Sequence, residues 1–165
     1  MASTYSSNLK LQLMGTGDNA GTWGAVTNVN LGTALEESIA GTVDVAFSSS
    51  DITLTLTDDN TAQAARNMRL NLTGTSGGAR NLIVPAIEKM YVVNNGLADA
   101  CTVKVSGQTG VAVPAGKTTL LFNNGTDIVN AITHLSSLTL ATDLAIADGG
   151  TGSSNASDAR TALGL

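Results

Sequence analysis

The sequence predicts a mainly β protein, built as an antiparallel β-sandwich or jelly-roll-like domain. An N-terminal segment with one helix precedes this domain, and an extended C-terminal tail that ends in a short helix follows it. Two observations predict this class. Apolar and polar residues alternate from Thr42 to about Ile132, as they do in half-buried strands. The stretches between them are rich in Asn, Asp, Gly and Ser, and the Asn-Gly dipeptides among them favour hairpins.

Residues 1–41 are expected to form the N-terminal segment. The stretch Asn8–Met14 alternates briefly, as a strand would, and a glycine-rich loop follows it. Thr22 is then placed to cap a helix, and Gly41 is placed to end it in the left-handed conformation. Between them, apolar residues recur at helical spacing: Val26, Val29, Ala34, Leu35 and Ile39.

Residues 42–132 are expected to form the β domain, with eight or nine short strands separated by turns. The predicted strands are Val43–Phe47, Ile52–Leu56, Met68–Leu72, Leu82–Val84, Lys89–Val93, Cys101–Val105, Val111–Val113, Thr118–Phe122 and Thr126–Ile132. Residues 133–165 are expected to form an extended, stalk-like segment and then a short helix. The leucine-containing part of this segment could instead be a further strand of the domain.

The composition is unusual in two respects. Aromatic residues make up only 3% of the 165 residues, so the core must be built from Val, Leu, Ile and Ala. Charged residues make up 13%, about half of the usual level near 25%. A low charge fits a polar but neutral β-protein surface, and it fits equally a surface covered by other subunits, since charge is depleted at interfaces.

The charge pattern and the hydropathy pattern exclude several classes of partner. The net charge is −5 and the eight basic residues are scattered, so no basic face for nucleic acid is expected. No apolar run is long enough for a membrane-spanning helix. The first eight residues are polar and do not resemble a secretory signal. The single cysteine, Cys101, has no partner for an internal disulfide and is expected to be a small buried side chain.

No catalytic residue, cofactor site or metal site is predicted. His134 is the only histidine, whereas acid–base catalysis and most zinc sites need a histidine with a positioned partner. Asp58–Asn60 lacks the alternating ligand spacing of a calcium loop and is expected to be a turn. The segment Val111–Thr118 ends in Gly-Lys-Thr, as a phosphate-binding loop does, but Val111 stands where that motif needs glycine.

Several apolar residues lie in segments that cannot bury them. The C-terminal helix is shorter than the 12–15 residues or so at which isolated helices become stable, so it needs a partner from outside the segment. Trp23, the only tryptophan, is expected to be either an internal anchor or an interface residue. The candidate interface residues are Trp23, Leu31, Leu35, Leu138, Leu140, Leu144, Ile146, Leu163 and Leu165.

Three sets of passages carry a resemblance to a known family. They are Gly17–Gly24 with Thr27–Gly32, then Asn81–Pro85, Val103–Gly110 and Asn124–Asp127, and finally the Gly-Gly-Thr-Gly…Ala-Arg…Leu-Gly-Leu element of Gly149–Leu165. Together they resemble bacteriophage tail fibres and related virion fibre proteins. The resemblance implies a homotrimer, located in the virion, whose N-terminal segment attaches to another virion protein: a tail, adaptor, baseplate or capsid protein.

The expected function is therefore structural rather than enzymatic: the virion-proximal part of a trimeric tail fibre that serves host attachment. The sequence fits either a short protein or the proximal part of a longer fibre. Two alternatives stay open. One is a capsid decoration or head-fibre protein, and the other is a carbohydrate-binding domain.

Overall fold

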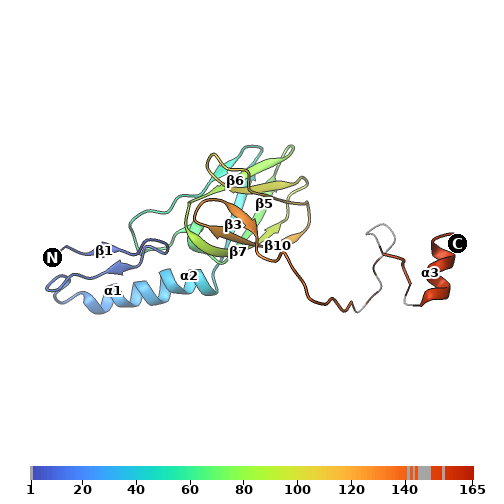
Figure 1. Cartoon of the computed structure of the whole chain (residues 1–165). Coiled ribbons are helices and arrows are strands. Elements are labelled where there is room, and N and C mark those ends of the chain that lie inside the picture. The colour runs from blue at the N-terminus through green and yellow to red at the C-terminus, as the bar shows by residue number, and fades with distance from the viewer. Residues whose placement is uncertain (1, 141, 143, 145–149, 154) are drawn as a thin grey trace. The chain divides into compact units, whose positions relative to one another are not determined.

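A computed structural model describes residues 2–140, 142, 144, 150–153 and 155–165 of the chain (Figure 1). It divides the chain into two units, Met1–Ile132 and Thr133–Leu165. The protein is mainly β, which confirms the predicted class. The first unit contains a β domain and a helical arm, and the described residues of the second contain one short helix.

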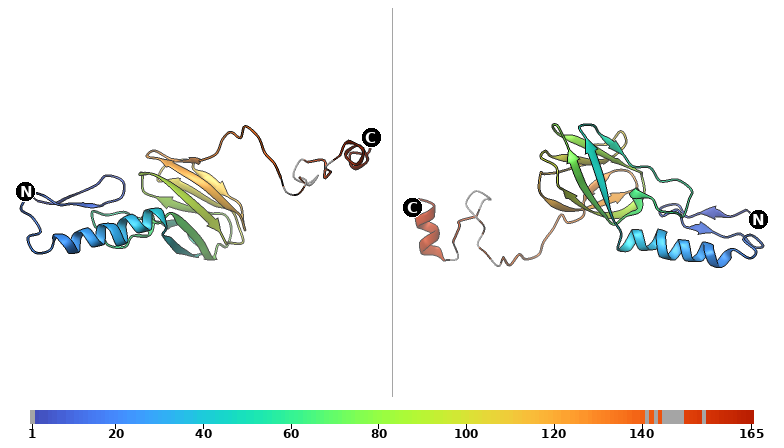
Figure 2. Two further views of the ribbon diagram at one scale, coloured as in Figure 1. Left: turned by 90° about the horizontal axis from the view of Figure 1, so that it is seen from below. Right: turned by 180° about the vertical axis from the view of Figure 1, so that it is seen from behind.

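The β domain consists of two sheets (Figures 1 and 2). The five-stranded sheet has the order β11-β10-β7-β5-β3, and the four-stranded sheet has the order β4-β6-β8-β9. The strands of the first sheet are β3 (Thr42–Ser48), β5 (Arg69–Thr75), β7 (Glu88–Asn95), β10 (Thr118–Asn124) and β11 (Ile128–Asn130). The strands of the second are β4 (Ile52–Thr53), β6 (Arg80–Val84), β8 (Cys101–Val105) and β9 (Val111–Val113).

The prediction that the sheets are antiparallel is wrong, because both sheets are mixed. Strands β3, β5 and β7 run parallel to one another, and so do β4, β6 and β8, while β9, β10 and β11 pair antiparallel. From β3 to β8 the chain crosses to the other sheet after each strand, so successive strands of one sheet have the same direction. The turns in this part are therefore corners between sheets rather than hairpins.

The corner after β7 shows why the hairpin signal misleads. The Asn94-Asn95-Gly96 sequence does bend the chain, but the Gly96 N–H donates to the carbonyl of Leu72, 3.0 Å away on a neighbouring strand. Asn95 is fully buried, and its side-chain amide donates to the carbonyls of Asp99 and Val113 at 3.0 and 2.9 Å. The hydrogen bonds of Asn95 thus run to Asp99 and Val113, later in the chain, and not across a hairpin.

The core lies between the inner faces of the two sheets. The predicted alternation holds: Val45 and Phe47 point inward from β3, and Leu70 and Leu72 from β5. Cys101 is fully buried on β8, as expected, and burial raises the pKa of its thiol to about 11. Other core residues include Leu82, Val84, Tyr91, Val93, Leu97, Val103, Val105, Val113, Leu121 and Ile128.

On the outer face of the five-stranded sheet, one row of polar side chains joins four strands. The Asn71 amide donates to Asp44 at 2.6 Å, and the Asn94 amide donates to the Asn71 side-chain oxygen at 2.7 Å. The Thr118 hydroxyl donates to Asn94 at 2.7 Å. Because these residues are direct neighbours in the register of β3, β5, β7 and β10, the ladder stabilises the parallel pairing from outside.

The arm consists of a helix beside a small hairpin (Figure 1). The hairpin is β1 (Thr4–Tyr5) and β2 (Gln12–Leu13), so only part of the predicted Asn8–Met14 strand forms. The helix runs without a break through α1 (Trp23–Val29), the π-helical η1 (Asn30–Leu35) and α2 (Glu36–Ile39). Thr22 precedes the helix as predicted, although its side chain makes no capping hydrogen bond.

Asn30 ties the arm together. Its side-chain oxygen accepts from the Gln12 N–H and its amide donates to the Gln12 carbonyl, both at 2.9 Å, as a neighbouring strand would. The same oxygen accepts from the buried Asn60 amide at 3.1 Å. One side chain of the π-helical turn therefore holds the hairpin and the loop after β4 against the helix.

The predicted role of Gly41 is wrong in its mechanism. Its φ is not among the positive values in the chain, so it does not end the helix in the left-handed conformation. Instead it permits a close approach: a Cβ at this position would lie 2.4 Å from Asn67 Oδ1 and 2.5 Å from Glu37 Cα. Glycine is needed here because the chain turns tightly under the end of the helix to enter β3.

We expect Gly41→Ala to lower the free energy of unfolding by about 1–3 kcal/mol, the usual cost of forcing an extra methyl group into a packed site. Ala98→Ser is the matched control, because it also adds one heavy atom, but at an exposed loop position. That control should change the free energy of unfolding by less than about 0.5 kcal/mol. Urea denaturation of both variants measures the difference, and equal stabilities would contradict the close approach.

The helix of the second unit, α3 (Ala156–Ala162), is capped by Asn155, whose side-chain oxygen accepts from the Asp158 N–H at 2.9 Å. Before it, the Gly152 N–H donates to the Leu144 carbonyl at 3.0 Å. Residues 133–140 form neither helix nor strand. Among the described residues of this unit, none is buried.

Candidate interaction surfaces

The helical arm is fixed to the β domain by a buried charge cluster. Arg66, in the 3-10 turn η2 (Ala64–Arg66), is completely buried, and its Nε lies 3.1 Å from Glu37 Oε2 on α2. Its guanidinium also donates to the carbonyls of Asp59 at 3.3 Å and of Thr61. The Met68 N–H donates to the Glu37 carbonyl at 2.9 Å, so the helix end contacts the start of β5 directly. The arm therefore has a defined attachment to the domain.

Lys89 of β7 completes this cluster. Its Nζ donates to the carbonyls of Arg66 and Asn67 at 2.6 and 2.8 Å, and it lies 4.3 Å from the centre of the Tyr91 ring. The Tyr91 hydroxyl donates to the Ala65 carbonyl at 2.8 Å. Burial lowers the pKa of Lys89 to about 8 and raises the pKa of Tyr91.

This lowered pKa predicts a pH-dependent stability. Lys89 releases its proton near pH 8 in the folded chain but at about pH 10.4 when unfolded, so between these values the unfolded chain binds more protons. The contribution of Lys89 to the free energy of unfolding must therefore rise with pH, by about 1 kcal/mol between pH 7 and 9. Urea denaturation at both pH values measures it. Lys89→Met should lack this increment, and an unchanged pH profile in the variant would refute the assignment.

The first candidate surface is the exposed side of the arm helix. Trp23, Leu31 and Ile39 are 65%, 56% and 65% exposed, whereas Leu35 is half-buried. The predicted interface residues Trp23 and Leu31 are thus available for contact, and Trp23 is not an internal anchor. From Trp23 to Leu35 the helix carries no charged residue. An exposed helix without charges is unusual, because charged and polar residues normally cover the solvent face.

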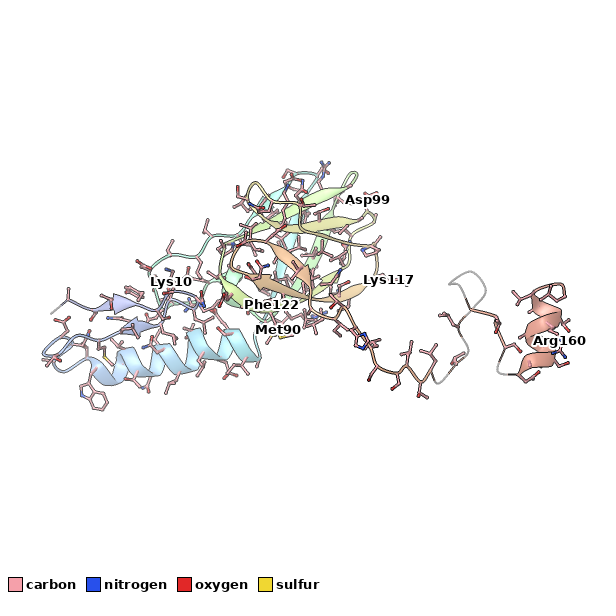
Figure 3. The ribbon with its side chains drawn as sticks, viewed as in Figure 1. Lys10, Met90, Asp99, Lys117, Phe122 and Arg160 are labelled. Atoms are coloured by element: carbon pink, nitrogen blue, oxygen red, sulfur yellow. The ribbon has the colours of Figure 1, made fainter. Side chains whose placement is uncertain are left out.

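The second candidate surface lies on the outer face of the five-stranded sheet. Met90, Phe122 and Val129 are 41%, 37% and 38% exposed. They face one another across β7, β10 and β11, since Met90 pairs with Phe122 and Phe122 with Val129. Figure 3 shows the Met90 and Phe122 side chains close together on this part of the domain.

Met90, Phe122 and Val129 are not among the interface residues predicted from the sequence. A signal was present, because the run Thr118–Asn124 has apolar residues on both faces: Leu121 is buried, while its neighbour Phe122 is exposed. A strand that is apolar on both faces has two surfaces to cover. Alternation alone identifies which residues share a face, but not that both faces need a partner.

The third candidate surface is the tail. The described residues predicted for contact are all exposed: Leu138 at 67%, Leu140 at 46%, Leu144 at 44%, Leu163 at 53% and Leu165 at 85%. The remaining one, Ile146, lies outside the described residues. Each exposed leucine forgoes about 1.5–3 kcal/mol that full burial would supply. The tail as described therefore has apolar side chains without a core of its own.

The polar residues considered for chemistry have structural roles or are exposed. The Asp59 carboxylate accepts from the Thr61 N–H at 2.8 Å, which makes Asp58–Asn60 the predicted turn, and Asp58 forms an ion pair with Lys10 at 3.0 Å. Gly116 has a φ of +68° in the turn between β9 and β10, where the Lys117 N–H donates to the Pro114 carbonyl. His134 is exposed in the tail.

Within the described part of the chain, no helix is both long enough and apolar enough to cross a bilayer. No model of a known protein family matches the chain, and no curated protein or solved structure matches it either. The functional interpretation therefore depends on the three surfaces and on the sequence motifs.

Proposed function

We propose that this chain is a structural protein of a bacteriophage virion, the virion-proximal part of a homotrimeric tail fibre that serves host attachment. The observation that carries the proposal is the tail: among the described residues after Ile132 none is buried, and six leucines are between 44% and 85% exposed. Neighbouring copies that wrap their tails together would bury these leucines. The Gly-Gly-Thr-Gly…Leu-Gly-Leu element of the same tail resembles the one found in phage fibres.

In this proposal two of the three surfaces, the tail and the arm helix, contact other copies of the chain. The hairpin end of the arm attaches to another virion protein of the tail or baseplate. The buried junction of Glu37, Arg66 and Lys89 supports this role, because it gives the arm a fixed attachment through which a load on the particle reaches the β domain.

Particle labelling tests the proposed location. Virions of the phage that encodes this chain would be purified and labelled with a gold-conjugated antibody raised against residues 42–132. We expect gold at the tail or baseplate, and a few copies per particle by quantitative mass spectrometry. Gold over the whole capsid with many copies would identify a decoration or head-fibre protein instead. Absence of the chain from purified virions would refute a virion role.

A further inference from the structure

The arm helix presents large and small residues in a repeat of eight. Trp23 is followed by Gly24, Leu31 by Gly32, and Ile39 by Ala40, so a large apolar residue and a small one recur at positions 23, 31 and 39. The large members are 65%, 56% and 65% exposed. About every two helical turns, a projecting apolar side chain therefore stands next to a residue with little or no side chain.

The two glycines have no explanation within the chain. Glycine inside a helix costs about 0.5–1 kcal/mol relative to alanine. A Cβ built on Gly24 or on Gly32 would have nothing within 4 Å, so neither position is crowded by the described part of the chain. Small residues on a helix surface allow the backbone of another helix to come close. We infer this role for Gly24 and Gly32.

The π-helical turn η1 brings Leu31 and Ile39 onto one side of the helix. In a regular α-helix, positions eight residues apart differ by about 80° around the axis, because two turns take only about 7.2 residues. A π-helical turn takes up more residues per turn than an α-helical turn. Because most of η1 (Asn30–Leu35) lies between Leu31 and Ile39, it brings the spacing of these two residues closer to two full turns, whereas the spacing from Trp23 to Leu31 runs mainly through the α-helical α1.

We propose that the helix Trp23–Ile39 packs in parallel and in register against the same helix of a second copy, with large residues of one helix filling the Gly24 and Gly32 gaps of the other. The inference rests on the proposed homo-oligomer and names its N-terminal contact. Packing of projecting side chains into gaps of a neighbouring helix is the geometry of coiled coils. A repeat of large and small residues on one helix is complementary to itself.

Charge favours a second copy over another partner. The chain has a net charge of −5, so two copies repel each other except where a surface carries no charge. The helix surface from Trp23 to Leu35 is such a surface. Two acidic residues follow this surface: Glu37 pairs with Arg66 inside the same chain, and Glu36 is exposed.

The apolar area of the arm helix fits one part of a larger contact between two copies. A tryptophan side chain alone can bury about 150–250 Å², and the three large residues together offer on the order of 400 Å². A standard interface buries about 800 Å² on each partner. The helix thus supplies about half of one interface, and the tail leucines supply further area in the same assembly.

Disulfide trapping in the full-length chain tests the proposal. The variant Gly32→Cys places a thiol in a gap, and two such residues form a disulfide only if their Cα atoms come within about 7 Å. The native Cys101 is fully buried and does not compete. The variant Gln108→Cys, in the exposed turn after β8, is the control. We expect rapid oxidation of the Gly32→Cys chain to a covalent dimer, one disulfide per trimer, and slow oxidation of the Gln108→Cys chain.

A second variant covers the case in which the Gly32→Cys substitution disturbs the helix. Leu31→Glu with Ile39→Glu adds charge to the proposed contact without touching the buried junction, and Gln108→Glu is its control. We expect the double variant to associate at least 10-fold more weakly, with unchanged circular dichroism of the β domain.

Two outcomes separate this contact from the proposed function. The helix contact alone would be refuted if the wild type is a trimer but Gly32→Cys and Gln108→Cys oxidise equally slowly. In that case the Leu31→Glu/Ile39→Glu variant would also associate as strongly as the wild type. A monomeric wild type would refute the proposed function as well.

Discussion

Replacing Arg66 with methionine is expected to lower the free energy of unfolding by about 3–5 kcal/mol, the usual cost of breaking a buried ion pair from one side. Arg66 is completely buried and lies 3.1 Å from the Glu37 carboxylate. Methionine has a similar length but leaves that carboxylate unpaired and three loop carbonyls, of Asp59, Asn60 and Thr61, without this donor. Chemical denaturation at pH 7 measures the loss.

Two further variants show whether the loss comes from the buried charge. Arg80→Met is the matched control, because Arg80 also donates to loop carbonyls, those of Ser76 and Gly77, but is only half-buried. Its cost should stay at about 1 kcal/mol. Adding Glu37→Gln to Arg66→Met removes the unpaired charge and should restore part of the stability. A loss for Arg66→Met no larger than for Arg80→Met would contradict the account of the junction.

The second large effect is expected in the tail. Leu163→Asp together with Leu165→Asp should weaken association at least 100-fold while the β domain stays folded. The two leucines are 53% and 85% exposed in the single chain, and burial of each against neighbours supplies about 1.5–3 kcal/mol. Two such losses per chain exceed the roughly 2.8 kcal/mol that corresponds to a factor of 100. Sedimentation velocity over a concentration series measures the shift.

The control for this pair adds the same charge to α3, directly before the two leucines. Ser157→Asp with Thr161→Asp places two aspartates on α3 at exposed positions that are not apolar. It should leave association within a few-fold of the wild type. If the leucine variant associates as strongly as this control, the tail is a passive linker and the proposed role of its leucines is wrong.

Much of the β domain could be predicted from alternation. The inward positions Val45, Leu72 and Val103 are all buried, because a half-buried strand must alternate whatever its neighbours are. Which strands pair could not be predicted. The pairing of Leu72 with Val45 and Asn95 depends on contacts between segments distant in sequence, and the Asn-Gly signals mark bends without showing whether the chain returns in the same sheet or crosses to the other.

The arm and its junction were predictable only in part. The helix follows from the spacing of its apolar residues, whereas the sequence left open whether Trp23 is an internal anchor or an exposed interface residue. The burial of Arg66 does not, since arginine is almost never fully buried unless it is paired, and its partner Glu37 is 29 residues away in sequence. The hydrogen bonds between Asn30, in the π-helical turn, and the Gln12 backbone likewise follow from no local sequence pattern.

The native mass of the full-length chain at micromolar concentration tests the central claim most directly. One chain has a mass of 16.6 kDa, and the proposed homotrimer would be three times as heavy. Native mass spectrometry, checked by light scattering, should therefore find a species of about 50 kDa, and the double aspartate variant of the tail should shift it toward the single-chain mass. A wild-type chain that stays at 16.6 kDa across this concentration range would contradict the proposal.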